Sequence, residues 1–224
     1  AFTGFIVPGL LGSLLGFGFW PGVLVGGLTR IVLSQHSTFL INSAAHTFGN
    51  QPYTDKNTAR DSFTMAVLTF GEGYHNYHHF FQADYRNGVR WYHWDPTKWV
   101  IRLMAIVGLA KRLKKVSAEE ILKARIAMEE KRIVAMGASQ DHVRALRDRI
   151  MAAQARWKQI QADFAKFKAD RKAALKDAVN GLPDAWNKLL VEKRAELELA
   201  RIEMKNALNA WKNYVRMWQR ATAV

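Results

Sequence analysis

AFTGFIVPGLLGSLLGFGFWPGVLVGGLT, residues 1–29, contains no charged side chain. This stretch is longer than the roughly 20 residues that cross a bilayer as a helix. Pro8, Pro21 and several glycines interrupt it, which favours two helical limbs over one straight helix. The alternative is a buried hairpin of a soluble protein, but uncharged glycine-rich runs of this length are rare in soluble cores.

We therefore expect a transmembrane helical hairpin. One limb runs from about Phe2 to Phe19, and Trp-Pro-Gly at 20–22 turns at the membrane interface, where tryptophan is favoured. The second limb continues through Leu40 toward His46. Arg30 falls inside that limb, and the cost of a charge in lipid means that its side chain should face protein or a water-filled cavity.

The charges of the chain are unevenly distributed. Residues 98–224 carry 28 Lys and Arg against 14 Asp and Glu, whereas residues 1–97 carry five of each sign. The net charge of +14 therefore belongs to the C-terminal part. The chain has no cysteine, which excludes disulfides, thiolate ligands and cysteine nucleophiles and leaves His, Asp, Glu and Asn as candidate ligands.

The segment after the apolar hairpin alternates between polar and apolar parts. Residues 49–62 are rich in turn formers and predict a loop, and the apolar run 63–70 leads to GEGYHNYHHF at 71–80. Residues 91–116 mix aromatic, apolar and basic side chains, a composition typical of a helix at the lipid headgroup boundary. By the positive-inside rule, the histidine cluster and the tail belong on the cytoplasmic side.

The tail is predicted to be helical throughout. Ser117–Glu120 reads as a capping box, Gly137 ends a first helix, and Ser139 caps a second that ends at Gly181–Pro183. Heptad-spaced apolar residues in the second and third helices predict an antiparallel coiled-coil hairpin. These residues are Val143, Leu146, Ile150, Ala153, Trp157, Ile160, Phe164 and Phe167, then Leu190, Leu197, Met204, Trp211 and Trp218.

The predicted fold is thus all-α, with two domains. Residues 1–115 hold the hairpin and the cytosolic histidine helices, and residues 116–224 form the basic coiled-coil tail. Nucleic acid is not an expected partner, because the aromatic residues of the tail lie in heptad seams and not at exposed stacking positions. We expect a tail with a solvated charged face that is capable of self-association.

His75, His78 and His79 stand at i, i+3 and i+4, which places them on one helix face. Their rings can converge on one point or on two neighbouring points, and a transition metal would stabilise such a cluster. Asn42 and His46 lie one helical turn apart at the end of the second limb. An all-nitrogen set in a membrane-embedded domain suits iron with positions open for oxygen.

Each histidine also has a simpler interpretation. The cluster could be a solvated helix face, and Asn42 with His46 a polar pair between membrane helices. We interpret His36 and His93 as packing or interface residues and His142 as a surface residue.

NSAAHTFGNQPY at 42–53 and GEGYHNYHHFFQADYRNGVRWY at 71–92, separated by a loop with DKNTARDS, resemble the C-terminal half of membrane-bound fatty acyl desaturases, in particular the acyl-CoA delta-9 family. The resemblance covers about residues 1–115. It implies a di-iron centre that uses O2 to desaturate an acyl chain carried on CoA, a carrier protein or a lipid. Electrons would come from a carrier such as cytochrome b5 or a ferredoxin.

By the same resemblance, His46, His75, His78 and His79 are iron ligands, and Asn42 acts directly or through a water. Glu72 is a candidate to orient one ring N–H, or it serves a turn instead.

The family has two further histidine boxes upstream, and this chain contains neither. We therefore expect a fragment of a longer product that is inactive alone, or a degenerate relative. A related histidine-box hydroxylase and a non-catalytic, membrane-tethered interaction module are the alternatives.

Overall fold

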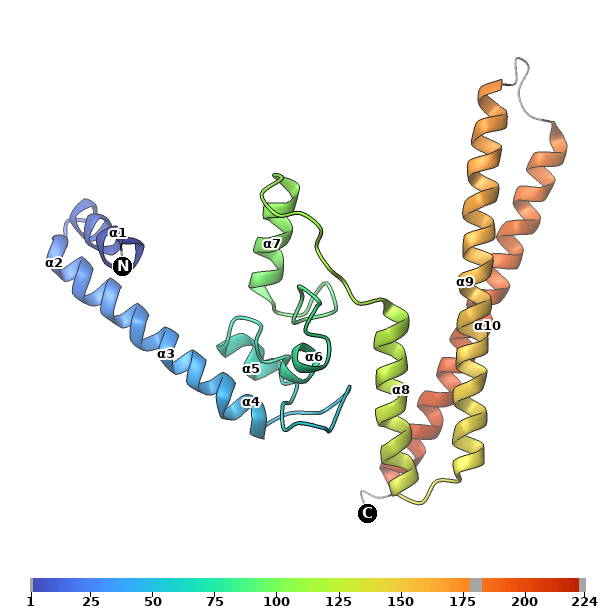
Figure 1. Cartoon of the computed structure of the whole chain (residues 1–224), viewed down its shortest axis with the longest axis horizontal. Helices are drawn as coiled ribbons and strands as arrows, with labels where there is room; N and C mark the ends of the chain where they lie inside the picture. Colours follow the sequence, from blue (N-terminus) through green and yellow to red (C-terminus); the bar gives the residue numbers. More distant parts are fainter. Residues whose placement is uncertain (1, 178–182, 222–224) are drawn as a thin grey trace. The chain divides into compact units, whose positions relative to one another are not determined.

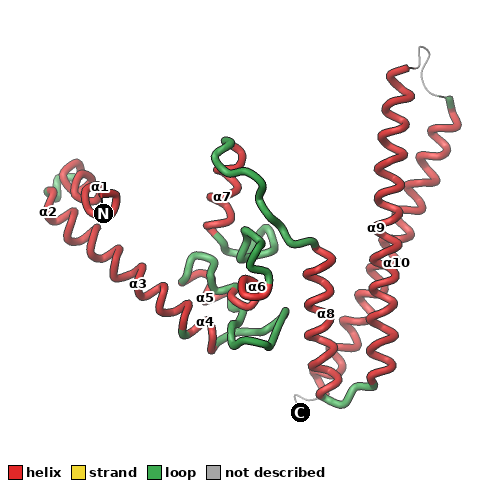
Figure 2. Tube along the Cα trace, in the orientation of Figure 1, coloured by secondary structure: helices red, strands yellow, loops and turns green. Residues whose placement is uncertain are grey.

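The computed structural model describes residues 2–177 and 183–221 of the chain, which form helices and connecting loops without a β-strand (Figure 2). Isolated antiparallel bridges pair Asp61 with Asn50 and with Tyr74. The predicted all-α class is confirmed for these residues. The chain divides into two compact units, Ala1–Arg125 and Ile126–Val224. The predicted domain division after residue 115 stays a prediction.

The first unit begins with two helical limbs packed against each other (Figure 1). The second limb continues from one element to the next without a loop. The elements are α1 (Phe2–Leu14), α2 (Phe19–Pro21), the π-helix η1 (Gly22–Leu28) and α3 (Thr29–Asn42).

The turn between the limbs lies earlier than the sequence predicts. The prediction of a turn at residues 20–22 is wrong, because the chain reverses at 15–18 and residues 19–21 already belong to α2. Gly16 and Gly18 have φ angles of 82° and 90°, a conformation that costs glycine little. Pro21 lies near the start of the second limb, where the missing N–H would have had no helical partner.

Apolar side chains cover the outside of this hairpin. Examples that are at least half exposed are Leu10, Leu11, Leu14, Leu15, Phe17, Trp20, Leu24 and Val25. The sequence predicts transmembrane spans here. In the described residues, however, no helix combines the length and the apolar character needed to cross a bilayer.

The remainder of the first unit consists of short helices and ordered loops. The polar loop predicted at 49–62 is confirmed, since it contains no helix. The side chain of Ser62 caps α5, and that of Asp95 caps α7. The helices are α4 (Ala44–Thr47), α5 (Phe63–Leu68), α6 (His75–Phe80) and α7 (Pro96–Ile106).

The tail begins with α8 (Ala118–Ala135), and the division of the chain into the two units falls between Arg125 and Ile126 of this helix. The predicted capping box is confirmed, because Glu120 N donates to Ser117 Oγ at 3.1 Å and Ser117 N donates to Glu120 Oε2 at 3.2 Å. The helix ends before Gly137, as predicted.

In the second unit, α9 (Gln140–Asp177) and α10 (Asp184–Ala221) lie side by side and run in opposite directions (Figure 1). Several predicted seam residues are buried, namely Val143, Ile150, Ile160, Phe167 and Trp211. Of the predicted turn at 181–183, Gly181 and Leu182 lie outside the described residues. Coiled-coil packing of the two helices stays a prediction.

Candidate metal centre

The short helix α6 presents two histidines on one face. His75 and His79 stand four positions apart, so their side chains lie one above the other. Their Nε2 atoms are 3.0 Å apart. His75 is buried, whereas His79 is partly exposed.

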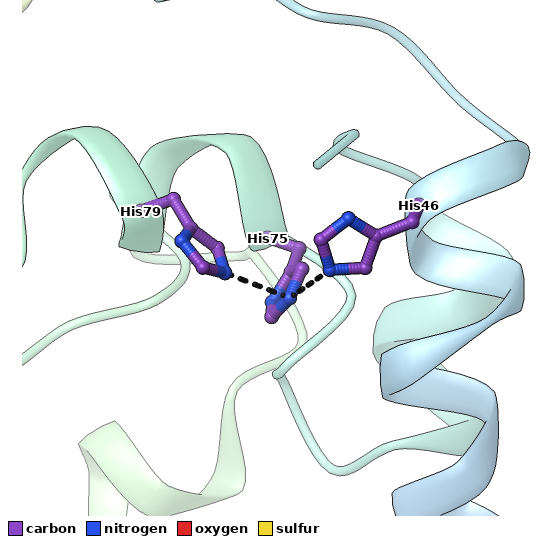
Figure 3. Close-up of side chains that lie close together, drawn as sticks. All are labelled: His46, His75 and His79. Carbon is purple, nitrogen blue, oxygen red and sulfur yellow. Dashed lines mark hydrogen bonds between the residues drawn. The ribbon is translucent and has the colours of Figure 1, made fainter. Parts of the chain in front are cut away.

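A third histidine reaches this pair from another part of the chain. Helix α3 ends at Asn42, Ser43 departs from helical geometry (φ −118°, ψ −71°), and the chain resumes as α4, which carries His46. His46 Nε2 lies 3.1 Å from His75 Nε2, so the rings of all three histidines converge (Figure 3). One nitrogen from each histidine lies within 4.8 Å of the others.

Asn76 holds the intervening loop against α6. Its side chain is completely buried. Its Oδ1 accepts from Tyr53 N at 2.9 Å and Thr54 N at 3.3 Å, and its Nδ2 donates to Thr54 O at 2.7 Å and Ala59 O at 2.9 Å. Because these bonds fix both sides of the loop, they position the chain that leads away from His46.

Two acidic residues anchor Tyr77, the next residue of α6. Asp61 Oδ1 accepts from Tyr77 N at 3.0 Å, and burial raises the pKa of this carboxyl to about 6. The hydroxyl of Tyr77 donates to Asp84 Oδ2 at 2.7 Å. Asp84 in turn accepts two hydrogen bonds from the guanidinium of Arg86. The helix that carries the histidines is therefore fixed by one side chain that precedes it in sequence, Asp61, and one that follows it, Asp84.

Burial and neighbouring histidines favour the neutral forms of His75 and His79. Burial, followed by the proximity of His79, His46 and His78, lowers the pKa of His75 to about 4. Burial and the neighbouring His78 and His46 also lower the pKa of His79. Neutral imidazole is the form that binds metal, so the lowered pKa values of His75 and His79 favour metal binding over protonation near pH 7.

The spacing of the nitrogens suits a transition metal. Two imidazole nitrogens that each bind one metal at roughly 2.1 Å, at an angle of about 90°, lie about 3 Å apart. The separations of two of the three pairs, 3.0 and 3.1 Å, match this value, and the third pair lies within 4.8 Å. His75 Nε2 cannot donate to one neighbour while accepting from the other, so a shared metal resolves this contact better than hydrogen bonding does.

The Nδ1 atoms of His46 and His75, which do not face the cluster, differ in their hydrogen bonding. His46 Nδ1 lies 2.8 Å from Thr58 Oγ1, and donation to this hydroxyl leaves Nε2 free to bind metal. His75 Nδ1 is buried and has no hydrogen-bond partner among the described residues. The backbone carbonyl of Glu72 favours protonation of His75, but falls short of hydrogen-bond geometry. The three residues fit a metal, but supply only part of a di-iron ligand set.

The other predicted site residues are His78, Asn42 and Glu72, which are not among these three. The ring of His78 lies 6.3 Å from that of His75 and 5.9 Å from that of His79, centroid to centroid. The amide of Asn42 donates to Thr38 O at 3.2 Å. Glu72 Oε1 accepts from Asn87 Nδ2 at 2.7 Å. Their predicted metal or orienting roles stay predictions.

Several residues that shape the site had no role in the sequence-based interpretation. Thr58 and Asn76 are the main examples, and the position of Asn76 between His75 and Tyr77 was the one available signal. The ring of His93 stacks on Tyr74 at 4.6 Å, in agreement with the packing role predicted for it. His142 is exposed, as predicted.

Comparison with known proteins adds an independent line of evidence. Residues 3–106 match the family model described as fatty acid desaturase. The chain is 46% identical over 131 residues to acyl-CoA desaturase 1 of Saccharomyces cerevisiae, covering 58% of this chain and 26% of that protein. It is 40% identical over 101 residues to an sn-1 stearoyl-lipid 9-desaturase of Synechocystis, covering 45% and 32%.

A third relative, an sn-1 stearoyl-lipid 9-desaturase of Anabaena variabilis, is 43% identical over 109 residues, which cover 49% of this chain and 39% of that protein. The chain thus spans between about a quarter and two fifths of the length of these three relatives. The matches to these three relatives extend over 131, 101 and 109 residues, so each is longer than the segment 46–79 that carries the histidine cluster.

Proposed function

Because residues 3–106 belong to the fatty acid desaturase family, we propose that this chain is part of a membrane-bound di-iron fatty acyl desaturase. The complete enzyme would introduce a double bond at delta-9 of a saturated acyl chain. It would use O2 and electrons from a small carrier such as cytochrome b5 or a ferredoxin. Relatives named as acyl-CoA and as stearoyl-lipid desaturases leave both acyl carriers as candidates.

The observation that carries this proposal is the convergence of His46 from α4 with His75 and His79 from α6. These three residues would bind one iron, and Thr58 would hold His46 in the tautomer that binds metal. His78 and Asn42 would serve a second iron, Asn42 directly or through a water. When bound, the iron pair supplies the oxidising power that amino-acid side chains lack for an unactivated C–H bond.

The protein residues contribute geometry and exclusion of water. Burial of His75 and the Asn76 network keep the ligands in place before metal binds. The chain holds about half of the histidines that such a centre needs. We therefore propose that two further histidine boxes from outside these 224 residues complete it, and that the chain alone is inactive.

We further propose that the apolar surface of the α1 and η1 hairpin is embedded in lipid, with the histidine cluster on the cytoplasmic side. The exposed side chains of Leu14, Phe17 and Trp20 support this arrangement, because apolar patches of this extent mark contact with lipid or another protein. The basic residues that follow the histidines support the orientation.

The proposal is tested with the complete gene product, expressed in yeast cells that lack their own delta-9 desaturase. We expect monounsaturated fatty acids, with the double-bond position read by mass spectrometry. We also expect iron to co-purify with the protein. His75→Ala and His79→Ala should abolish the product and lower the iron content, and His142→Ala is the matched control in the tail.

Three results would contradict the proposal. Iron content that stays unchanged in His75→Ala would refute the ligand assignment. Hydroxylated products would favour the related hydroxylases. A complete gene product that binds no iron would leave a membrane-tethered interaction module as the remaining interpretation.

A further inference from the structure

Helix α7 exposes one continuous apolar face. At 3,4 spacing along one side lie Trp99, Val100, Leu103, Met104, Ile106 and Val107. All six are exposed, with Ile106 the most accessible at 76%. Lys98, which is buried, lies on the other side of α7, and Arg102 lies at the edge of the apolar face. Soluble proteins rarely leave a whole helix face of this kind uncovered.

The orientation of α7 is fixed from its buried side. Asp95 is completely buried, and its Oδ1 accepts from Lys98 N at 2.9 Å to cap the helix. Lys98 Nζ donates to the carbonyls of Gly88 at 2.8 Å and Arg90 at 2.9 Å. Because these contacts hold the start of α7 against the loop before it, the apolar face is turned outward by the fold.

Aromatic side chains extend this surface at its N-terminal side. Trp91 is 84% exposed, and Tyr92 and Trp94 are also exposed. The rings of Trp94 and Trp99 meet edge to face at 5.5 Å, so the aromatic loop continues into the helix. We call the exposed residues of 91–94 together with the apolar face of α7 the α7 patch. Tryptophan and tyrosine favour the boundary between hydrocarbon and water.

A basic cluster follows the patch directly. Lys111, Arg112, Lys114 and Lys115 are all exposed, and residues 96–116 contain no acidic residue. The backbone of this cluster is tied to the unit, since Tyr85 N donates to Lys114 O at 3.1 Å. Val116 N also donates to Asp84 Oδ2 at 2.8 Å. The segment that carries the cations is therefore held against residues 84–85 of the same unit, a few residues after the patch in sequence.

We propose that the α7 patch is a binding site for a bilayer surface that contains anionic lipid. The aromatic and apolar side chains enter the headgroup boundary, and the four cations bind lipid phosphates and carboxylates. Apolar area alone would suit a protein partner equally well. The uncompensated basic cluster decides for anionic lipid, because each basic side chain near such a surface contributes about 1 kcal/mol. This inference does not depend on iron or on the proposed reaction.

The absence of cysteine from the chain allows one residue at a time to be labelled. We would place an environment-sensitive fluorophore on Leu103→Cys in the patch and, as the matched control, on Arg102→Cys, which lies outside the apolar face of α7. The full chain is reconstituted into vesicles of phosphatidylcholine alone or mixed with phosphatidylserine. Brominated acyl chains quench the labels that reach the hydrocarbon boundary.

We expect stronger quenching and a bluer emission for the label at 103 than for that at 102, and an increase of this difference with phosphatidylserine. Changing Lys111, Arg112, Lys114 and Lys115 together to Gln should remove the phosphatidylserine effect. Circular dichroism checks that each variant keeps its helix content. The apolar hairpin is unchanged in every variant, so differences between the two labels report on α7.

Two outcomes would overturn the proposal. Equal quenching of both labels in phosphatidylserine vesicles would show that the patch does not meet lipid. A label at 103 that is already shielded from water in detergent, and is unchanged by lipid composition, would show that a second copy or another protein segment covers the patch.

Discussion

His46 Nε2 lies 3.1 Å from His75 Nε2, although 29 positions of sequence separate the two residues. Neither α4 nor α6 extends beyond six residues, so helix propensity alone cannot hold the rings together. The approach depends on the loop between the helices and on the buried side chains that fix it. The first prediction therefore concerns the residue that makes most of these contacts.

Asn76→Ala should destabilise the first unit and weaken metal binding. The change leaves the buried N–H groups of Tyr53 and Thr54 and two carbonyls without their partner. At about 1–3 kcal/mol for each of the four unsatisfied groups, a loss of at least about 4 kcal/mol is expected. Denaturant unfolding in detergent and Co²⁺ titration measure the two effects. Asn50→Ala, at an exposed position of the same loop, is the control, and equal effects from both changes would refute the role of Asn76.

Gly73→Ala should prevent the histidine helix from reaching its present position. A Cβ at Gly73 would overlap the backbone of Met65 and Ala66 in α5, and backbone atoms cannot move aside as a flexible side chain does. Overpacking of this kind costs about 3 kcal/mol or more. We expect a lower midpoint of thermal unfolding and loss of Co²⁺ binding. Unchanged values for both would show that α5 can shift without affecting the site.

His93 should make the chain less stable in acid. Burial, followed by Lys98 and Arg90, lowers the pKa of His93 to about 4, from an ordinary value of 6.5. Between these values the unfolded chain binds more protons than the folded chain, so the free energy of unfolding falls as the pH drops from 6.5 to 4.

His93→Phe removes the titrating imidazole but keeps a ring that can stack on Tyr74. Urea unfolding above and below the pH window should therefore show a smaller acid-induced loss than in the unchanged chain. Part of the loss remains, because the pKa of His75 is lowered in the same direction. An identical loss in both proteins would mean that His93 titrates normally.

Trp211 should be the dominant side chain of the second unit. It is 1% exposed, and its indole N–H donates to Glu129 Oε2 at 2.6 Å. Trp211→Ala should cost about 3–5 kcal/mol, as for other large core residues. Trp211→Phe, which keeps most of the buried area, should cost less and report mainly on the hydrogen bond. Met217→Ala on the exposed side of the same helix is the control, and a loss equal to that of Trp211→Ala would contradict this assignment.

Local sequence signals located most of the helices. The Ser117–Glu120 capping box, Gly137 and the spacing of His75 and His79 act within one or two helical turns, so neighbouring residues are sufficient to specify them. The same is true of the polar loop at 49–62. The turn of the apolar hairpin was misplaced because glycine and proline both interrupt helices. Only the structure shows that Gly16 and Gly18 turn while Pro21 begins the next limb.

By itself, the sequence indicated which residue types could bind metal and predicted that His75, His78 and His79 share one helix face. Only the tertiary structure decided that His46 meets His75 and His79 while the Asn42 amide bonds within its own helix. The break at Ser43 and the packing of Asn76 against the loop produce this difference. Such contacts join residues far apart in sequence. Their energy depends on how deeply the groups are buried in the folded chain, which the sequence around each residue does not specify.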